Sequence, residues 1–212
     1  MTTATDDAAK LLTFIDEQRI AVETSSGAPA WNHMGAVLAD AAIQPLRLYR
    51  SWVKPRVVAL RNDWPDAATT EGLQARLATD DVAAALKNLD SPRRTAKIPA
   101  LAQVMADHNI DTVAELRTQL ADPDTRTPLR RDIRKVRDVG PKTVDYFDRL
   151  AGLPEGVAID SRLRAVAAAA GIENTGYDHL AAVIRAAAKQ RGWAPADLDA
   201  ALWRYGQPAF DK

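Results

Sequence analysis

The chain has 212 residues, of which 28 are basic and 28 acidic, and it contains no cysteine. The absence of thiols excludes disulfides, a cysteine nucleophile, and zinc or iron–sulfur sites held by cysteine. The chain is 47% hydrophobic, as suits a folded globule, but no apolar run reaches the roughly 18–20 residues that span a bilayer. Because residues 1–7 are polar and acidic, unlike a secretory signal, we expect a cytoplasmic protein with no membrane partner.

Apolar residues recur at spacings of three and four, which is the helical period, and strand-like alternation is nearly absent. Alanine, the strongest helix former, is abundant. These patterns predict an all-α protein. In chain order, the predicted helices cover residues 8–22, 32–43, a segment from 45 that breaks near Pro55, 71–78, 81–89, 91–108, 111–122, 128–137, 141–151, 161–170, 178–190 and 196–205.

Residues that start or stop helices lie at several of these ends. Asp6, Ser91 and Asp160 carry side chains that cap helix N-termini. Gly171 follows an alanine-rich segment, and glycine most readily adopts the left-handed conformation just beyond a helix. We therefore expect Asp160 to open a helix that ends at Gly171.

Charge is unevenly distributed although the total is zero. Residues 1–30 hold two basic and five acidic side chains, whereas residues 45–62 hold five basic side chains and no acid. Residues 130–164 hold nine basic and six acidic side chains, with the basic ones concentrated at the start. Either basic stretch alone is typical of a solvated helical face, so charge does not by itself identify a partner.

A tight turn is predicted at Val136–Gly140, between two helices. Such a turn leaves backbone N–H groups unpaired at the start of the second helix, where they point outward with the positive end of the helix dipole. Because these features attract anions, the turn predicts a phosphate site. Arg134, Lys135 and Arg137 lie close enough to add positive charge.

Two segments together resemble the helix-hairpin-helix DNA glycosylase superfamily (HhH-GPD), and within it the endonuclease III-like branch. Val136–Gly140 is similar to the family's Leu-Pro-Gly-Val-Gly hairpin, and Lys142 occupies the position of its catalytic lysine, two residues later. Asp160-Ser161 resembles the family's Val-Asp-Thr/Ser segment, and Asp160 follows Lys142 by eighteen residues, as in that branch. The resemblance is sharp over residues 130–171 and fainter over 91–101.

This resemblance implies two helical subdomains that flank a cleft, one over residues 31–140 and the other over 1–30 plus 141–212. It implies a base-excision-repair DNA glycosylase, with AP-lyase activity by β-elimination, that acts on a flipped damaged or mispaired base in duplex DNA. Lys142 would be the amine that attacks the sugar, and Asp160 the carboxylate that stabilises positive charge on it. The residues that would contact DNA are Lys135, Arg137, Val139, Gly140, Thr143 and Arg162.

Three features depart from the family's pattern. Asp138 replaces the first hairpin glycine; aspartate tolerates a positive φ, but its carboxylate is unfavourable beside a phosphate unless a cation lies between them. Pro141 suits the first position of a helix but removes one N–H donor. The family's four-cysteine iron–sulfur loop cannot exist in this chain. We therefore expect no cofactor, although a monovalent cation could lie at the hairpin.

Other interpretations stay open. Alone, Asp160 would be an ordinary N-cap and Lys142 an exposed helix lysine. A non-catalytic helix-hairpin-helix DNA-binding protein, a monofunctional glycosylase and a helical protein-interaction domain are the alternatives. For the DNA-directed functions we expect a nucleoid-associated monomer that binds double-stranded DNA. The three histidines lack metal-ligand spacing and are interpreted as packing or surface residues.

Overall fold

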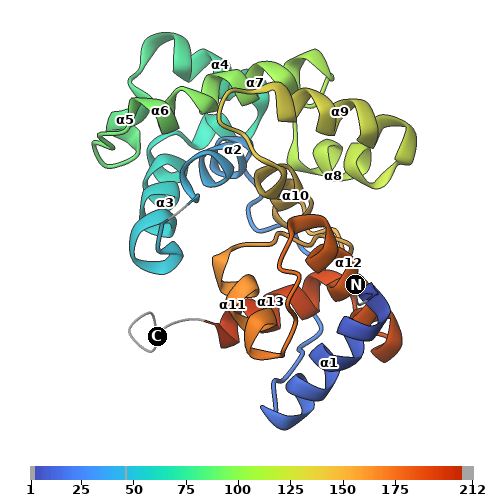
Figure 1. Ribbon diagram of the computed structural model, residues 1–212. Helices are drawn as coiled ribbons and strands as arrows, with labels where there is room; N and C mark the ends of the chain where they lie inside the picture. The colour runs from blue at the N-terminus through green and yellow to red at the C-terminus, as the bar shows by residue number, and fades with distance from the viewer. Residues whose placement is uncertain (1–2, 46, 207–212) are drawn as a thin grey trace. The chain divides into compact units, whose positions relative to one another are not determined.

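The computed structural model describes residues 3–45 and 47–206. These two ranges fold into helices joined by turns and loops, and they contain no strand (Figure 1). The all-α prediction is therefore confirmed. The chain folds into a central unit, residues 29–152, and a terminal unit, which combines the residues before 29 with those from 153 onward. The expected boundary at residue 140 lies instead at residue 152. The reason is that α10 (Pro141–Leu150) packs on α2 and α9 and so belongs to the central unit.

The central unit is built around one helix that is buried on all sides. In chain order it contains α2 (Met34–Ile43), the π-helical turn η1 (Tyr49–Val53), α3 (Lys54–Asp63), the 3-10 turn η2 (Pro65–Ala68), α4 (Thr70–Thr79), α5 (Val82–Ala85), α6 (Pro92–Thr95), α7 (Lys97–Asp107), α8 (Val113–Ala121), α9 (Pro123–Lys135) and α10. All ten residues of α2 are buried, because α3, α7 and α10 pack around it. A helix that is apolar around its whole circumference is expected in such a position.

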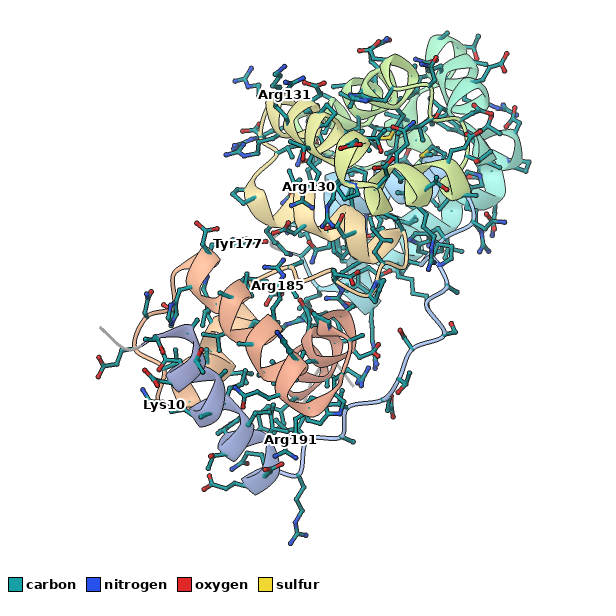
Figure 2. The ribbon with its side chains drawn as sticks, turned by 90° about the vertical axis from the view of Figure 1, so that its right-hand side faces the viewer. Lys10, Arg130, Arg131, Tyr177, Arg185 and Arg191 are labelled. Carbon is teal, nitrogen blue, oxygen red and sulfur yellow. The ribbon has the colours of Figure 1, made fainter. Side chains whose placement is uncertain are left out.

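The terminal unit joins the first helix of the chain to the last three. It contains α1 (Ala4–Glu17), α11 (Ser161–Ala169), α12 (Tyr177–Arg191) and α13 (Pro195–Tyr205). Figure 2 shows α1, which carries Lys10, beside α12, which carries Arg191. Leu11 and Ile15 of α1 share a core with Val183 of α12, and this burial gives the unit its own apolar centre.

The first helix begins and ends earlier than predicted. Thr3 is the N-cap of α1: its hydroxyl accepts from the Asp6 N–H, and the Asp6 carboxylate accepts from the Thr3 N–H. Asp6 is therefore the third residue of a capping box rather than the cap itself. The helix ends at Glu17 rather than at residue 22, because Arg19 adopts a left-handed φ of 53°.

Two predicted helices of the central unit are shorter or broken. The helix expected over 91–108 divides into α6 and α7, because Pro99 has no N–H to donate to the carbonyl one turn earlier. The helix expected over 81–89 ends at Ala85, and Lys87 and Asn88 follow with φ of 57° and 51°. Proline and left-handed residues thus end helices where apolar spacing alone would continue them.

The predicted ends of the alanine-rich helix in the terminal unit are confirmed. Asp160 is the N-cap of α11, and Gly171 follows that helix with a φ of 74°. Pro195 lies in the first turn of α13. Over residues 3–45 and 47–206, the structure contains no helix with the length and apolar character that a bilayer crossing requires.

Candidate functional site

Residues 136–140 form a tight turn between α9 and α10 (Figure 1). The Val139 N–H donates to the Val136 carbonyl at 3.1 Å, which closes a four-residue turn. Asp138 has a φ of 64° and occupies the third position, where type II turns require a positive φ. The prediction that aspartate can take the place of glycine in this turn is confirmed.

Two arginines brace the 136–140 turn from neighbouring helices. From α9, the Arg134 guanidinium donates to the Val139 carbonyl. From α6, Arg93 holds both carboxylate oxygens of Asp138, with 2.6 Å from Nε to Oδ2. These hydrogen bonds hold the pKa of Asp138 below its usual range. A cation therefore lies beside the carboxylate that would otherwise repel a phosphate.

Ion pairs on the inner side of α10 fix that helix against α9. Asp148 is 1% exposed and accepts from Arg126 at 2.7 Å and from Arg130 at 2.6 Å, while Arg130 also pairs with Asp145. In Figure 2, Arg130 lies between the two helices, whereas Arg131 projects from the outer side of α9. Part of the basic 130–164 stretch thus serves internal structure and is not available to a partner.

The start of α10 offers fewer free donors than the sequence predicts. The N–H groups of Thr143 and Val144 both donate to the Gly140 carbonyl, and Pro141 has none. The Gly140 N–H makes no hydrogen bond to any residue in the described ranges. A Cβ added at Gly140 would meet nothing within 4 Å, so its backbone borders open space. Gly140 therefore offers a backbone donor to a phosphate.

The side chains expected to contact DNA have different surroundings. Val139 and Thr143 are buried, and their N–H groups already donate to the Val136 and Gly140 carbonyls. Lys135 is exposed and pairs with Asp132 at 2.7 Å. Arg137 is exposed on the turn itself. The surface of this turn thus presents Lys135, Arg137 and the Gly140 backbone.

Lys142 lies in the first turn of α10, half-buried in the central unit. Its Nζ donates to Gln44 Oε1 at 2.6 Å and lies 5.8 Å from the centre of the Tyr146 ring. Gln44 is the C-cap residue of α2. The amine is therefore held by groups that come from two helices.

Tyr146 links this amine to a buried carboxylate, because its ring faces Lys142 and its hydroxyl donates to Asp40. Asp40 of α2 is fully buried and accepts from Trp31 Nε1 at 2.8 Å, from the Tyr49 hydroxyl at 3.0 Å and from the Tyr146 hydroxyl at 3.1 Å. Burial raises the pKa of Asp40 to about 6, and the three hydrogen bonds and the charge of Lys142 offset only part of that rise.

Sequence reasoning did not assign a role to Asp40, Gln44 or Tyr146. One signal was present, since Asp40 is the single charged residue in α2, which is otherwise entirely apolar. A carboxylate in a helix of that kind indicates a buried, hydrogen-bonded group. Nothing local in the sequence identified its partners.

Asp160 lies in the terminal unit at the start of α11. Its Oδ1 accepts from the N–H groups of Arg162 and Leu163 at 2.9 and 3.0 Å, and Oδ2 accepts no hydrogen bond from the residues described. The Arg162 guanidinium lies 4.6 Å from the centre of the Trp203 ring, a cation–π contact within the same unit. Asp160 is thus a helix cap with one oxygen left for another interaction.

The histidines have structural partners. His33 caps α2, His108 contacts Asp132 at 3.0 Å, and His179 contacts Asp7 at 2.9 Å. Their interpretation as packing or surface residues is confirmed. Within residues 3–45 and 47–206, no three acidic or histidine side chains come together as metal ligands.

A family model described as a domain of unknown function (DUF8548) matches residues 60–207, and the chain belongs to this family. The matched region includes the 136–140 turn, Lys142 and Asp160, whereas Asp40 lies before it. No curated protein and no solved structure matches the chain.

Proposed function

We propose that the protein is a base-excision-repair DNA glycosylase with AP-lyase activity, in which α9, the 136–140 turn and α10 form a helix-hairpin-helix motif. The proposal rests on the resemblance of Val136–Gly140, Lys142 and Asp160 to the endonuclease III-like branch. The observation that carries it is the Lys142 amine, which lies half-buried in the first turn of the helix that follows a tight turn.

The substrate is a damaged or mispaired base in duplex DNA, flipped out because C1′ is unreachable inside the helix. The neutral Lys142 amine forms a bond to C1′ as the N-glycosidic bond breaks, and the base leaves with a proton. As the C1′–O4′ bond breaks and the sugar ring opens, the remaining amine proton passes to O4′, which leaves a Schiff base between Lys142 and C1′. Removal of a C2′ proton then expels the 3′ phosphate.

Asp160 has the chemistry needed to stabilise the positive charge that develops on the sugar. Its Oδ1 caps α11, which fixes the carboxylate, and its Oδ2 accepts no hydrogen bond within the described ranges. The DNA backbone would be held at the turn by the Gly140 N–H, with Lys135 and Arg137 adding positive charge.

Borohydride trapping tests this proposal, because it reduces a Schiff base to a stable covalent link between protein and DNA. We expect the wild-type protein to be trapped on duplex DNA that contains an abasic site, and Lys142→Gln to lose the trapped species. The matched control is Lys87→Gln, an exposed lysine of the central unit, which should be trapped as the wild type is. Equal trapping of Lys142→Gln, or none with the wild type, would refute the lyase proposal.

A non-catalytic DNA-binding protein is the second candidate, and the surroundings of Lys142 favour it. Gln44 already accepts a hydrogen bond from the amine at 2.6 Å, which holds Lys142 as a donor within the central unit. In that case we expect duplex binding whose log affinity falls with log salt with a slope on the order of −2 to −5. No trapping and no base release would accompany it.

A panel of single-lesion duplexes, incubated with and without alkali, separates the remaining functions. Strand cleavage without alkali indicates the bifunctional enzyme. Cleavage only after alkali indicates a monofunctional glycosylase in which Lys142 contacts phosphate. Binding that does not depend on salt would exclude DNA as the partner.

A further inference from the structure

The central unit contains a pocket of about 480 Å³ on the outer side of the 136–140 turn, where that turn meets α6 and α7. Three basic side chains and one carboxylate line it, namely Arg93, Lys97, Arg137 and Asp138, and the rest of its wall is alanine and valine. Its volume falls in the range of small-molecule sites, roughly 300–1,000 Å³. None of these side chains belongs to the Lys142 and Asp40 cluster.

Lys97 is the unusual member of this group. The residue is only 7% exposed, yet its ammonium makes no hydrogen bond or ion pair with any residue of the described ranges. Burial lowers the pKa of Lys97, as do the charges of Arg94 and Arg93, whereas the charge of Asp138 raises it. The Lys97 Nζ is not among the buried side-chain nitrogens that lack a partner, so it keeps contact with the solvent that fills the pocket. An anion in the pocket would supply the missing partner.

The charges around the pocket indicate which kind of anion it would bind. Arg93 uses Nε and one terminal nitrogen to hold both oxygens of Asp138, so this pair is neutral overall, and its other terminal nitrogen has no partner in the described ranges. Lys97 and Arg137 then contribute two uncompensated positive charges. A phosphate monoester carries about −1.5 to −2 at pH 7 and offers three acceptor oxygens, whereas a backbone phosphodiester carries a single charge.

We propose that this pocket binds a terminal phosphate monoester, with Lys97 and Arg137 contacting its oxygens. Such a group occurs on a free mononucleotide and at the end of a DNA strand. The inference stands on the pocket, the buried Lys97 and the local charge, and it does not require Lys142 to be catalytic.

Calorimetric titration of the full chain with deoxyadenosine 5′-monophosphate, and with deoxyadenosine as the uncharged probe, tests this inference. We expect binding of the monophosphate and none of the nucleoside. Lys97→Met should weaken monophosphate binding at least about tenfold, the effect of losing a charge-assisted contact. Lys87→Met, the same change at an exposed lysine of the central unit, should leave binding unchanged. Equal binding of the two probes, or of Lys97→Met and wild type, would overturn the proposal.

Arg137→Gln provides a second variant, because Arg137 is exposed and its replacement should not affect folding. It should weaken monophosphate binding several-fold, and unchanged affinity would count against the proposal.

Nicked duplexes with a 5′-phosphate or a 5′-hydroxyl at the nick distinguish the two sources of the phosphate. Tighter binding of the phosphorylated nick, lost in Lys97→Met, identifies a strand end. Binding of the mononucleotide with no preference between the nicks identifies a free nucleotide. Because trapping through Lys142 uses a different readout, either proposal can fail while the other holds.

Discussion

Replacing Asp40 by asparagine removes the buried charge that Tyr146 links to Lys142 while keeping its hydrogen bonds. The asparagine Oδ1 can accept from Trp31 Nε1 and the Tyr49 hydroxyl, as Asp40 Oδ2 does now. Its Nδ2 can donate to the Tyr146 hydroxyl, which now donates to Oδ1. Since the side chains have nearly the same volume, the main change is the loss of a carboxylate that is fully buried.

The pKa of Asp40 gives the size and sign of the expected effect. In the folded protein it is about 6, against an ordinary value of 3.8, so the folded state binds the Asp40 proton more tightly than the unfolded chain does. The free energy of unfolding should therefore fall as pH rises from about 4 to about 6, and stay lower above that range. A difference of about two units corresponds to about 3 kcal/mol. Because asparagine does not ionise, the free energy of unfolding of Asp40→Asn should not fall over this pH range.

Urea unfolding from pH 4 to pH 8, followed by tryptophan fluorescence, measures the effect. Near pH 4 the two proteins should have similar stability, and at pH 7.5 Asp40→Asn should be more stable by up to about 3 kcal/mol. The control is Asp63→Asn, an exposed carboxylate of the central unit, which should follow the wild type at every pH. If Asp40→Asn shows the wild-type pH dependence, or is less stable at pH 7.5, the carboxylate is not a buried charge and the reasoning is wrong.

Two further predictions concern the helices that carry Lys142 and Asp160. Asp160→Asn should keep the cap of α11, with a free energy of unfolding within about 0.5 kcal/mol of the wild type, whereas Asp160→Ala should lose about 1 kcal/mol. If Asp160 acts on the sugar, both variants should lose base release equally, and retained activity in Asp160→Asn would assign the residue to capping alone. Asp148→Asn should destabilise the central unit by about 1–2 kcal/mol in chemical denaturation, because Arg126 loses its buried partner while Arg130 keeps Asp145, and because the burial that raises the pKa of Asp148 already opposes its charge. A loss below about 0.5 kcal/mol, the scale of a typical surface substitution, would show that α9 and α10 do not depend on these ion pairs.

Much of the helical structure could be predicted because its signals are local. The cap at Asp160, the glycine at 171 and the left-handed Asp138 depend on residues within about four positions of one another. Local signals also explain the wrong predictions of helix ends. At the start of α1, the capping box begins at Thr3, so Thr3 and not Asp6 is the N-cap. Pro99 likewise divided a segment that apolar spacing alone predicted as one helix.

The surroundings of the candidate site depended on contacts between distant parts of the chain. Lys142 meets Gln44 across 98 positions, Tyr146 meets Asp40 across 106, and Arg93 reaches Asp138 across 45. The sequence alone identifies Lys142 and Asp138 as residues of interest, because the turn residues and the spacing of the motif can be recognised from the order of residues in the chain. Which charge is buried, which is paired and which still lacks a partner depends on the packing of α2, α6 and α10, and burial sets the energy of a charge.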